Sequence, residues 1–152
     1  MLSRRATAKN HNNAPTETHM NKLLACAAAA LLLGACATTE KELTDKGATP
    51  LDAAKARALL AGNTATGTTA SGNGFMIYNA PDGTLRGKSG NSSDSGKWEV
   101  TADGQQCNHW TTWRGGQRRC ARLYEVDGEI RYFEDGKYGG RYKIEPGNPY
   151  RL

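Results

Sequence analysis

Apolar residues along the chain change their period near residue 63, which predicts a helix followed by β-strands. The segment 51–62, LDAAKARALLAG, has helical spacing of its apolar residues. Thr49 is a suitable N-cap, Pro50 suits the first helical position and Gly62 suits the C-cap. The expected buried stripe of this helix consists of Leu51, Ala54, Ala58 and Leu59.

From Asn63 onward the pattern alternates with a period of two, which is typical of half-buried strands. Residues 75–79 form an apolar run, and in 97–101 Trp98 and Val100 share one face. The same alternation near the C-terminus places four residues on one face: Tyr138, Gly140, Tyr142 and Ile144.

Five glycine dipeptides separate these strand-like runs. Asp-Gly occurs at 82–83, 103–104, 127–128 and 135–136, and Gly-Gly at 115–116. These dipeptides favour tight hairpin turns. We therefore expect a mainly β domain, an antiparallel meander of six to eight short strands with one N-terminal helix. Closure into a small barrel removes the exposed edges; a curled open sheet is the alternative.

The N-terminal part of the chain has the pattern of an export signal. Lys22 precedes an apolar run of 11 residues from Leu23 to Leu33, followed by the small residues Gly34 and Ala35. A transmembrane anchor is the alternative, but a span needs ~20 apolar residues. We predict a signal peptide over 1–35; residues 1–19 are either a long leader or the product of a start assigned upstream of Met20.

The sequence Leu33-Gly34-Ala35-Cys36 resembles the lipobox of bacterial lipoproteins. That resemblance implies lipidation of Cys36 and cleavage before it; a secreted protein with a free cysteine is the alternative. Ala37, in place of Asp, resembles lipoproteins sorted to the outer membrane. We expect a cell-envelope protein facing the periplasm, with a lipid-anchored polar tether over 36–49 and a β domain over 50–152.

The charge of the expected mature chain is nearly balanced. The chain has 20 basic and 15 acidic residues, and residues 1–35 contain four basic residues and one acidic residue. The remainder therefore has a net charge of +2, so we expect no nucleic acid partner. All eleven aromatic residues lie between Phe75 and the C-terminus. Because aromatic side chains bury large areas, the core is expected there.

Cys107 and Cys120 remain once Cys26 is removed with the signal and Cys36 is lipidated. An even pair in an oxidising compartment predicts a disulfide. A two-residue turn at 115–116 would place Cys107 opposite Tyr124 instead, so the disulfide requires a shifted turn or a bulge. A redox pair would prefer the spacing C-x-x-C.

The best candidate binding surface surrounds the dipeptide Gly115-Gly116. Arginine beside tryptophan binds carboxylates, phosphates or sugars by paired hydrogen bonds and stacking. The alternative is a solvated hairpin with its tryptophans packed inward, and strand alternation places Trp110 and Trp113 on opposite faces. The surface consists of Trp110, Trp113, Arg114, Arg118, Arg119 and Arg122.

The sequence offers little for catalysis or for a metal. His109 is the only histidine after residue 36, and no nucleophile-elbow sequence accompanies it. With Cys107 and Cys120 it makes three potential ligands, one short of a closed site. We expect no enzyme activity, no cofactor and no metal. An acidic stretch follows and resembles solvated charge near turns: Glu125, Asp127, Glu129, Glu134 and Asp135.

Several short strings between residues 50 and 149 resemble an uncharacterised family of small exported proteins of Gram-negative bacteria. They are DGTLRG at 82–87, GKWEV at 96–100, Asp103-Gly104 with Cys107, Trp110 and Cys120, and PGNP at 146–149. The resemblance implies export, the disulfide and one compact β domain, and it implies no activity. The expected architecture also resembles, more loosely, the small envelope lipoproteins that bind or inhibit lysozymes.

The function expected from these observations is a non-enzymatic envelope lipoprotein that acts as a binding or interaction module. Its partner besides the membrane would be an envelope protein, a glycan or an acidic ligand. One alternative is a structural protein that packs against a membrane assembly. Another is an inhibitor-like protein or an unrecognised hydrolase, which would depend on His109 or a carboxylate pair.

Overall fold

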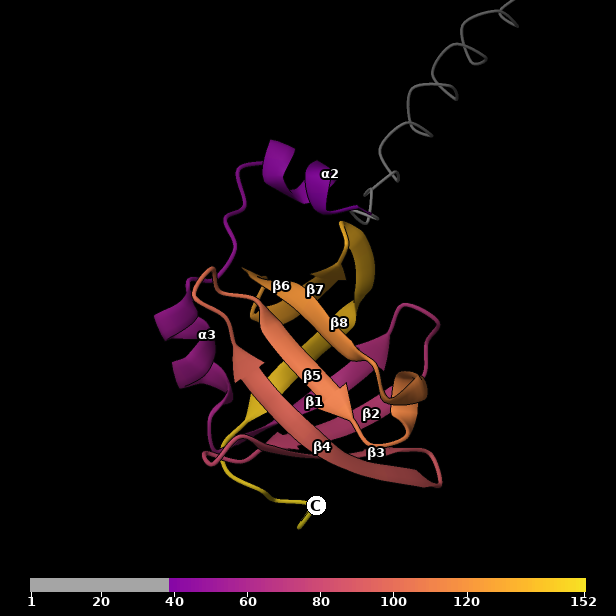
Figure 1. Cartoon of the computed structure of the whole chain (residues 1–152). Coiled ribbons are helices and arrows are strands. Elements are labelled where there is room, and N and C mark those ends of the chain that lie inside the picture. Colours follow the sequence, from indigo (N-terminus) through magenta and orange to yellow (C-terminus); the bar gives the residue numbers. More distant parts are fainter. Residues whose placement is uncertain (1–38) are drawn as a thin grey trace, which may run out of the picture. The chain divides into compact units, whose positions relative to one another are not determined.

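The computed structural model describes residues 39–152 (Figure 1). The predicted signal peptide and the predicted lipidation of Cys36 lie outside the described residues. Two short helices, α2 (Glu40–Asp45) and α3 (Ala53–Leu60), precede the strands. The strands are β1 (Asn63–Thr69), β2 (Gly74–Asn79), β3 (Thr84–Ser89), β4 (Ser92–Val100), β5 (Gln106–Trp110), β6 (Arg118–Val126), β7 (Glu129–Glu134) and β8 (Lys137–Glu145), with a short 3₁₀ turn, η2 (Trp113–Gly116), between β5 and β6.

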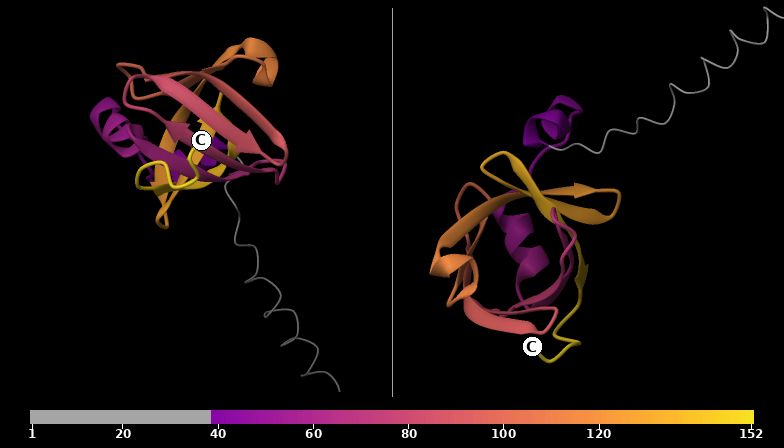
Figure 2. Two further views of the ribbon diagram at one scale, coloured as in Figure 1. Left: turned by 90° about the horizontal axis from the view of Figure 1, so that it is seen from below. Right: turned by 90° about the vertical axis from the view of Figure 1, so that its right-hand side faces the viewer.

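The eight strands form a closed antiparallel barrel in chain order, which confirms the predicted meander. Each strand pairs with the next one along the chain. β8 also pairs with β1, from Thr64 opposite Glu145 to Thr69 opposite Gly140, so the sheet has no free edge. The strand ring is visible in the right-hand view of Figure 2.

Two of the Asp-Gly dipeptides form the predicted two-residue hairpin turns. Asp127 and Gly128 have φ of +53° and +75°, and Asp135 and Gly136 have +50° and +75°. Positive φ at both positions is the mark of a type I′ turn. At 82–83 and 103–104 only the glycine has a positive φ, and the connections there are longer.

One end of the barrel is closed by α3, whose Ala56 and Leu60 are fully buried. They belong to a core cluster with inward-facing strand residues such as Leu85, Trp98 and Leu123. Figure 2 shows α3 across the strand ring. This half of the barrel interior is filled with apolar side chains, so any open space must lie toward the other end.

The predicted N-terminal helix is present, but its cap and its buried face differ from the prediction. Asp52, not Thr49, is the N-cap, and its carboxylate accepts the backbone N–H of Lys55 at 2.8 Å. Ala54 and Ala58 are exposed rather than buried. Alanine occurs on every side of this helix, so composition could not distinguish the buried face. The tertiary contacts of α3 decide it.

Residues 39–48 are folded against the barrel, so the prediction of a polar tether is wrong for this segment. Thr39 begins α2 with a capping box. Leu43 is only 5% exposed because it packs against Tyr124 and Phe133 on the outer face of the barrel. The carboxylate of Glu40 accepts a hydrogen bond from the Tyr124 hydroxyl at 2.6 Å. Leu43 thus holds residues 39–48 against the barrel, although the composition of this segment is mostly polar.

A bulge in β8 changes the face that Tyr138 occupies. Tyr132 pairs with Gly140, but the next residue, Phe133, pairs with Tyr138, so Gly139 is an extra residue. Tyr138 therefore packs against Phe133 on the outer face, with ring centroids 5.7 Å apart. The prediction that Tyr138 shares the face of Tyr142 is wrong, because strict alternation does not survive a bulge.

Candidate functional site

The barrel contains a cavity of about 470 Å³. It lies toward the end opposite α3, where the β1–β2, β3–β4, β5–β6 and β7–β8 connections meet; we call this end the mouth. Eight-stranded barrels of this kind can hold one small ligand, and the volume is in the usual range of ligand pockets. The inward-facing residues that matter most here are Phe75, Gln106, Asn108, Trp110, Trp113 and Arg119.

Aromatic rings form much of the cavity wall. Phe75, Tyr132 and Tyr142 come from β2, β7 and β8, and their ring centroids lie 6.0–6.5 Å apart. Trp110 and Trp113 contribute two more rings, with centroids 4.7 Å apart. Burial of the Tyr132 hydroxyl, followed by the nearby Glu134 carboxylate, raises the Tyr132 pKa to about 12. The wall is therefore apolar, with neutral hydroxyl groups at neutral pH.

The two tryptophans do not point to opposite faces, contrary to the prediction. The chain leaves the β conformation after Trp110, since Thr112 has φ −125° and ψ −39°. This kink turns Trp113 back against Trp110. Gly87 on β3 makes room for both rings, because a Cβ there would lie 2.6 Å from Trp110 and 2.8 Å from Trp113.

Asp94 holds the loop that carries Trp113. Its carboxylate accepts the backbone N–H groups of Thr112 and Trp113 at 2.9 and 2.7 Å. Desolvation raises the pKa of Asp94, but the hydrogen bonds from Trp113, Thr112 and Ser95 outweigh it and hold the pKa below 3.8. The indole N–H of Trp113 donates to Ser92 at 2.9 Å, which fixes the ring at the mouth.

Deeper in the cavity, polar side chains are joined by hydrogen bonds. Gln106, which is buried, donates to Asn79 and to Asn108, both at 3.3 Å. The hydroxyl of Tyr142 donates to Gln106 at 3.3 Å, and burial raises the pKa of that hydroxyl. The amide nitrogen of Asn79 has no partner in the described part of the chain.

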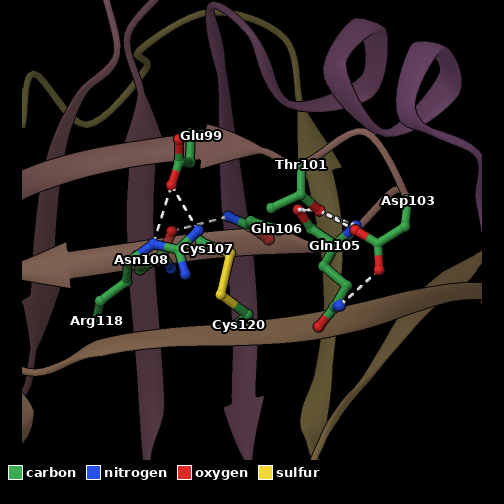
Figure 3. The surroundings of a disulfide bond; sticks show 9 residues. All are labelled: Glu99, Thr101, Asp103, Gln105, Gln106, Cys107, Asn108, Arg118 and Cys120. Carbon is green, nitrogen blue, oxygen red and sulfur yellow. Dashed lines mark hydrogen bonds and ion pairs between the residues drawn. A yellow bond between two sulfur atoms is a disulfide. The ribbon is translucent and has the colours of Figure 1, made fainter.

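The predicted arginine cluster is divided by the barrel wall. Arg114 and Arg119 line the cavity. Arg118 is on the outer face, where its guanidinium binds Glu99 at 2.6 and 2.9 Å (Figure 3). Arg122 is also outside, 3.9 Å from Glu40 of α2. Alternation along β6 explains the split, so the predicted residues do not form one continuous surface, and whether any of them binds a ligand stays a prediction.

The disulfide between Cys107 and Cys120 is confirmed, and it joins directly opposed residues of β5 and β6 (Figure 3). The connection between these strands runs from Thr111 to Gln117, not through a two-residue turn at 115–116. The longer connection shifts the register and removes the predicted conflict. A cross-link over a loop of this length stabilises the fold by about 3 kcal/mol in the chain-entropy model.

The candidate catalytic residues do not gather in the cavity. His109 is exposed on the outer face of β5, between Lys97 and Arg118 of the neighbouring strands. Within the acidic stretch, Glu134 alone lines the cavity. Among residues 39–152 no group of three or more His, Cys, Asp or Glu is placed to hold a metal ion.

Several cavity residues were not singled out from the sequence. Phe75 lies in an apolar run that predicts only a strand, and Gln106 and Asn108 flank Cys107, which predicts only a disulfide. Their alternation with Cys107 could have shown that they face the side opposite the disulfide. Nothing local indicates that Glu134 and Arg114 meet, since 20 residues separate them.

Comparison with known proteins adds one match. A family model described as a protein of unknown function matches residues 28–132. No curated protein matches the chain. In the part of the chain that the structure describes, no helix has the length and apolar character needed to cross a membrane.

Proposed function

The chain belongs to the DUF995 family of proteins of unknown function, and we propose that it is a non-enzymatic lipoprotein of the cell envelope that binds a small molecule in its barrel cavity. The observation that carries this proposal is the open half of the barrel. The interior near α3 is filled by apolar side chains, whereas about 470 Å³ toward the mouth is left open.

The residues that line this space indicate a ligand site rather than a cavity left by imperfect packing. Cavities that are mere defects are small and apolar, whereas ligand sites combine apolar walls with a few placed polar groups. Here Trp110 and Phe75 provide apolar surface, and Asn108 and Arg119 provide hydrogen-bond donors. Gly87 is compatible with a ligand site, because its lack of a side chain leaves room for the tryptophan pair at the mouth.

Export and anchoring are supported by the sequence and by the disulfide. Cys36 ends an apolar run in a lipobox-like string. The Cys107–Cys120 bond is of a kind that persists in oxidising compartments. More than one acyl chain on Cys36 would give stable anchoring where a single chain would not. We propose the outer membrane, with the barrel facing the periplasm, as the location.

Binding is tested with the neutral fluorescent probe N-phenyl-1-naphthylamine on the full-length protein in phosphatidylcholine vesicles. Energy transfer from the protein's tryptophans reports probe that is bound near Trp110 and Trp113. The matched variant is Ala121→Phe, because Ala121 lines the cavity and a phenyl ring there would occupy it. Ala121→Leu serves the same purpose if the larger side chain prevents folding.

We expect saturable energy transfer in the wild type and at least tenfold weaker probe binding in the filled variants. A wild type that transfers no more energy than the filled variants would refute cavity binding. Circular dichroism and the intact disulfide establish that each variant is folded.

Anchoring is tested by native mass spectrometry of the protein extracted from its own membranes, with and without reductant. We expect a chain that begins at an acylated Cys36, and a mass increase of two hydrogens on reduction of the disulfide. An unmodified chain that begins at Met1 or Met20 would overturn the anchored location.

A further inference from the structure

The charged side chains that line the cavity leave one positive charge uncompensated. Three of them are charged: Arg114, Arg119 and Glu134. Arg114 forms a two-point ion pair with Glu134, in which one hydrogen bond is 2.9 Å long. Arg119 has no ion pair within residues 39–152. The cavity therefore has a net charge of +1.

Most hydrogen-bond donors of the Arg119 guanidinium are available to a ligand. Its guanidinium donates to the side-chain oxygen of Gln117 at 2.6 Å, and an arginine has five N–H donors in all. Asn108 is directly opposite Arg119 on β5, and both line the cavity. The Asn108 oxygen is already used as the acceptor for Gln106, so its amide N–H₂ group is available. Opposed residues on neighbouring strands lie ~5 Å apart, so the two donor groups can bind one oxyanion.

The cavity is shallow. Its lining on β1 extends from Thr69 at the mouth to Ala65, which is about 13 Å of strand at ~3.3 Å per residue. Below that level the interior is filled by Leu60, Leu85 and their neighbours. An extended long acyl chain does not fit this depth, whereas a compact ring system does. The aromatic walls suit a planar apolar body.

We propose that the cavity binds a small monoanion with a compact, planar apolar body. Its oxyanion is held by Arg119 and Asn108, and its apolar body lies against the aromatic walls near Trp110 and Phe75. This inference rests on the proposed function, since it specifies the ligand of the same cavity. Arg118, which precedes Arg119 but points outward to Glu99, provides a matched control.

The test compares two probes of similar size that differ in charge. 8-Anilinonaphthalene-1-sulfonate is an aromatic monoanion, and N-phenyl-1-naphthylamine is the same ring system without the sulfonate. Both are titrated into wild type, Arg119→Gln and Arg118→Gln as full-length protein in phosphatidylcholine vesicles. Energy transfer from the tryptophans is the readout, and the Ala121→Phe variant gives the background from probe in the bilayer.

We expect Arg119→Gln to weaken binding of the anionic probe at least fivefold and to change binding of the neutral probe less than twofold. Arg118→Gln should leave both affinities unchanged. Anionic binding that is equal in wild type and Arg119→Gln, while the neutral probe still binds and responds to Ala121→Phe, overturns this inference alone. Failure of both probes to bind the wild type overturns the proposed function as well.

The compact shape is tested by competition. We expect 1-naphthoate to displace the anionic probe from the wild type and hexadecanoate to do so at least tenfold less well. Equal displacement by hexadecanoate would overturn the shape part of the inference.

Discussion

At the scale of single residues, small or charged side chains set the position of the tryptophan pair. Gly87 is needed for its lack of a side chain rather than for an unusual backbone angle, because the two indole rings occupy the space of a Cβ. Asp94 is needed for its two carboxylate hydrogen bonds to the loop of Trp113. Neither residue carries a local sequence pattern that reveals its partner.

Gly87→Ala is predicted to displace the tryptophan pair and to lower the free energy of unfolding by about 1–3 kcal/mol, the usual cost of overpacking. The coupled circular dichroism bands of Trp110 and Trp113 should weaken at the same time. Chemical denaturation and circular dichroism measure the two effects. Gly74→Ala is the control, because a Cβ there would meet only one atom, at 4.0 Å. Equal stability of the two variants would contradict the packing argument.

The loop that carries Trp113 is predicted to be sensitive to acid, because the carboxylate of Asp94 holds it. The pKa of Asp94 is lower in the folded protein than the ordinary 3.8, so its stabilising contribution is present above pH 3.8 and is lost as the pH falls through the lowered value. We expect the coupled tryptophan bands of the wild type to decay as the pH falls through the lowered pKa of Asp94, below 3.8. In Asp94→Ala the bands should already be weak at pH 7, with no acid step.

Asp45→Ala, on α2 and far along the chain from the loop, should keep the wild-type acid step of the tryptophan bands. Asp82 and Asp103 also have lowered pKa values, from hydrogen bonds to Thr84 and to Thr101 respectively. Overall stability therefore falls in acid too, and the tryptophan bands are the readout that isolates Asp94.

At the scale of elements, α2 is attached to the outer face of the barrel by buried Leu43 and by hydrogen bonds of Glu40. It has six residues, too short to be stable alone, so its structure depends on docking. Leu43 fills a site between Tyr124 and Phe133, and Glu40 accepts the Tyr124 hydroxyl. Alternation and the β8 bulge place three large rings on the outer face of the barrel, those of Tyr124, Phe133 and Tyr138. Docking of α2 shields these rings from solvent.

Leu43→Ala is predicted to undock α2 without unfolding the barrel. Loss of a buried leucine costs about 2–5 kcal/mol, more than a six-residue helix can compensate. Native-state hydrogen exchange should lose protection in residues 40–48 and keep it in β3 to β6. Lys46→Ala, at an exposed position of the same segment, should keep the wild-type protection. Joint loss of protection in the barrel would contradict separate docking.

At the scale of the whole molecule, the barrel divides into a packed half and an open half. The packed half, with α3 and Leu85, supplies most of the core. The open half has the aromatic walls and the charged groups. Such a division lets a small protein retain a stable core while it keeps an open site. A site of this kind is expected to reduce stability relative to a filled barrel.

Ala121→Phe is therefore predicted to leave the free energy of unfolding unchanged or to raise it, while it weakens probe binding at least tenfold. The added ring replaces open space rather than packed neighbours. Denaturant unfolding without probe measures the change. A loss of more than about 2 kcal/mol, typical of overpacking, would mean that the space near Ala121 is not open to a side chain.

The sequence by itself determined the class of the fold and the cross-link. Alternation and the Asp-Gly turns are local signals, so the antiparallel meander and the hairpins at 127–128 and 135–136 could be predicted. The disulfide followed from the number of cysteines left in the expected mature chain. The buried face of α3 and the docking of α2 could not be predicted from the same signals, because contacts with the barrel decide both.

Only the tertiary structure decided the candidate site. Closure of the barrel brings Phe75, Trp110 and Tyr132 to one cavity although they are far apart in sequence. A seven-residue connection and a one-residue bulge each shifted a register, and a one-residue shift moves a side chain to the other face of a strand. Arg118 and Arg119, adjacent and alike in sequence, lie on opposite sides of the barrel wall because side chains alternate along β6, and only barrel closure shows that the side of Arg119 is the cavity.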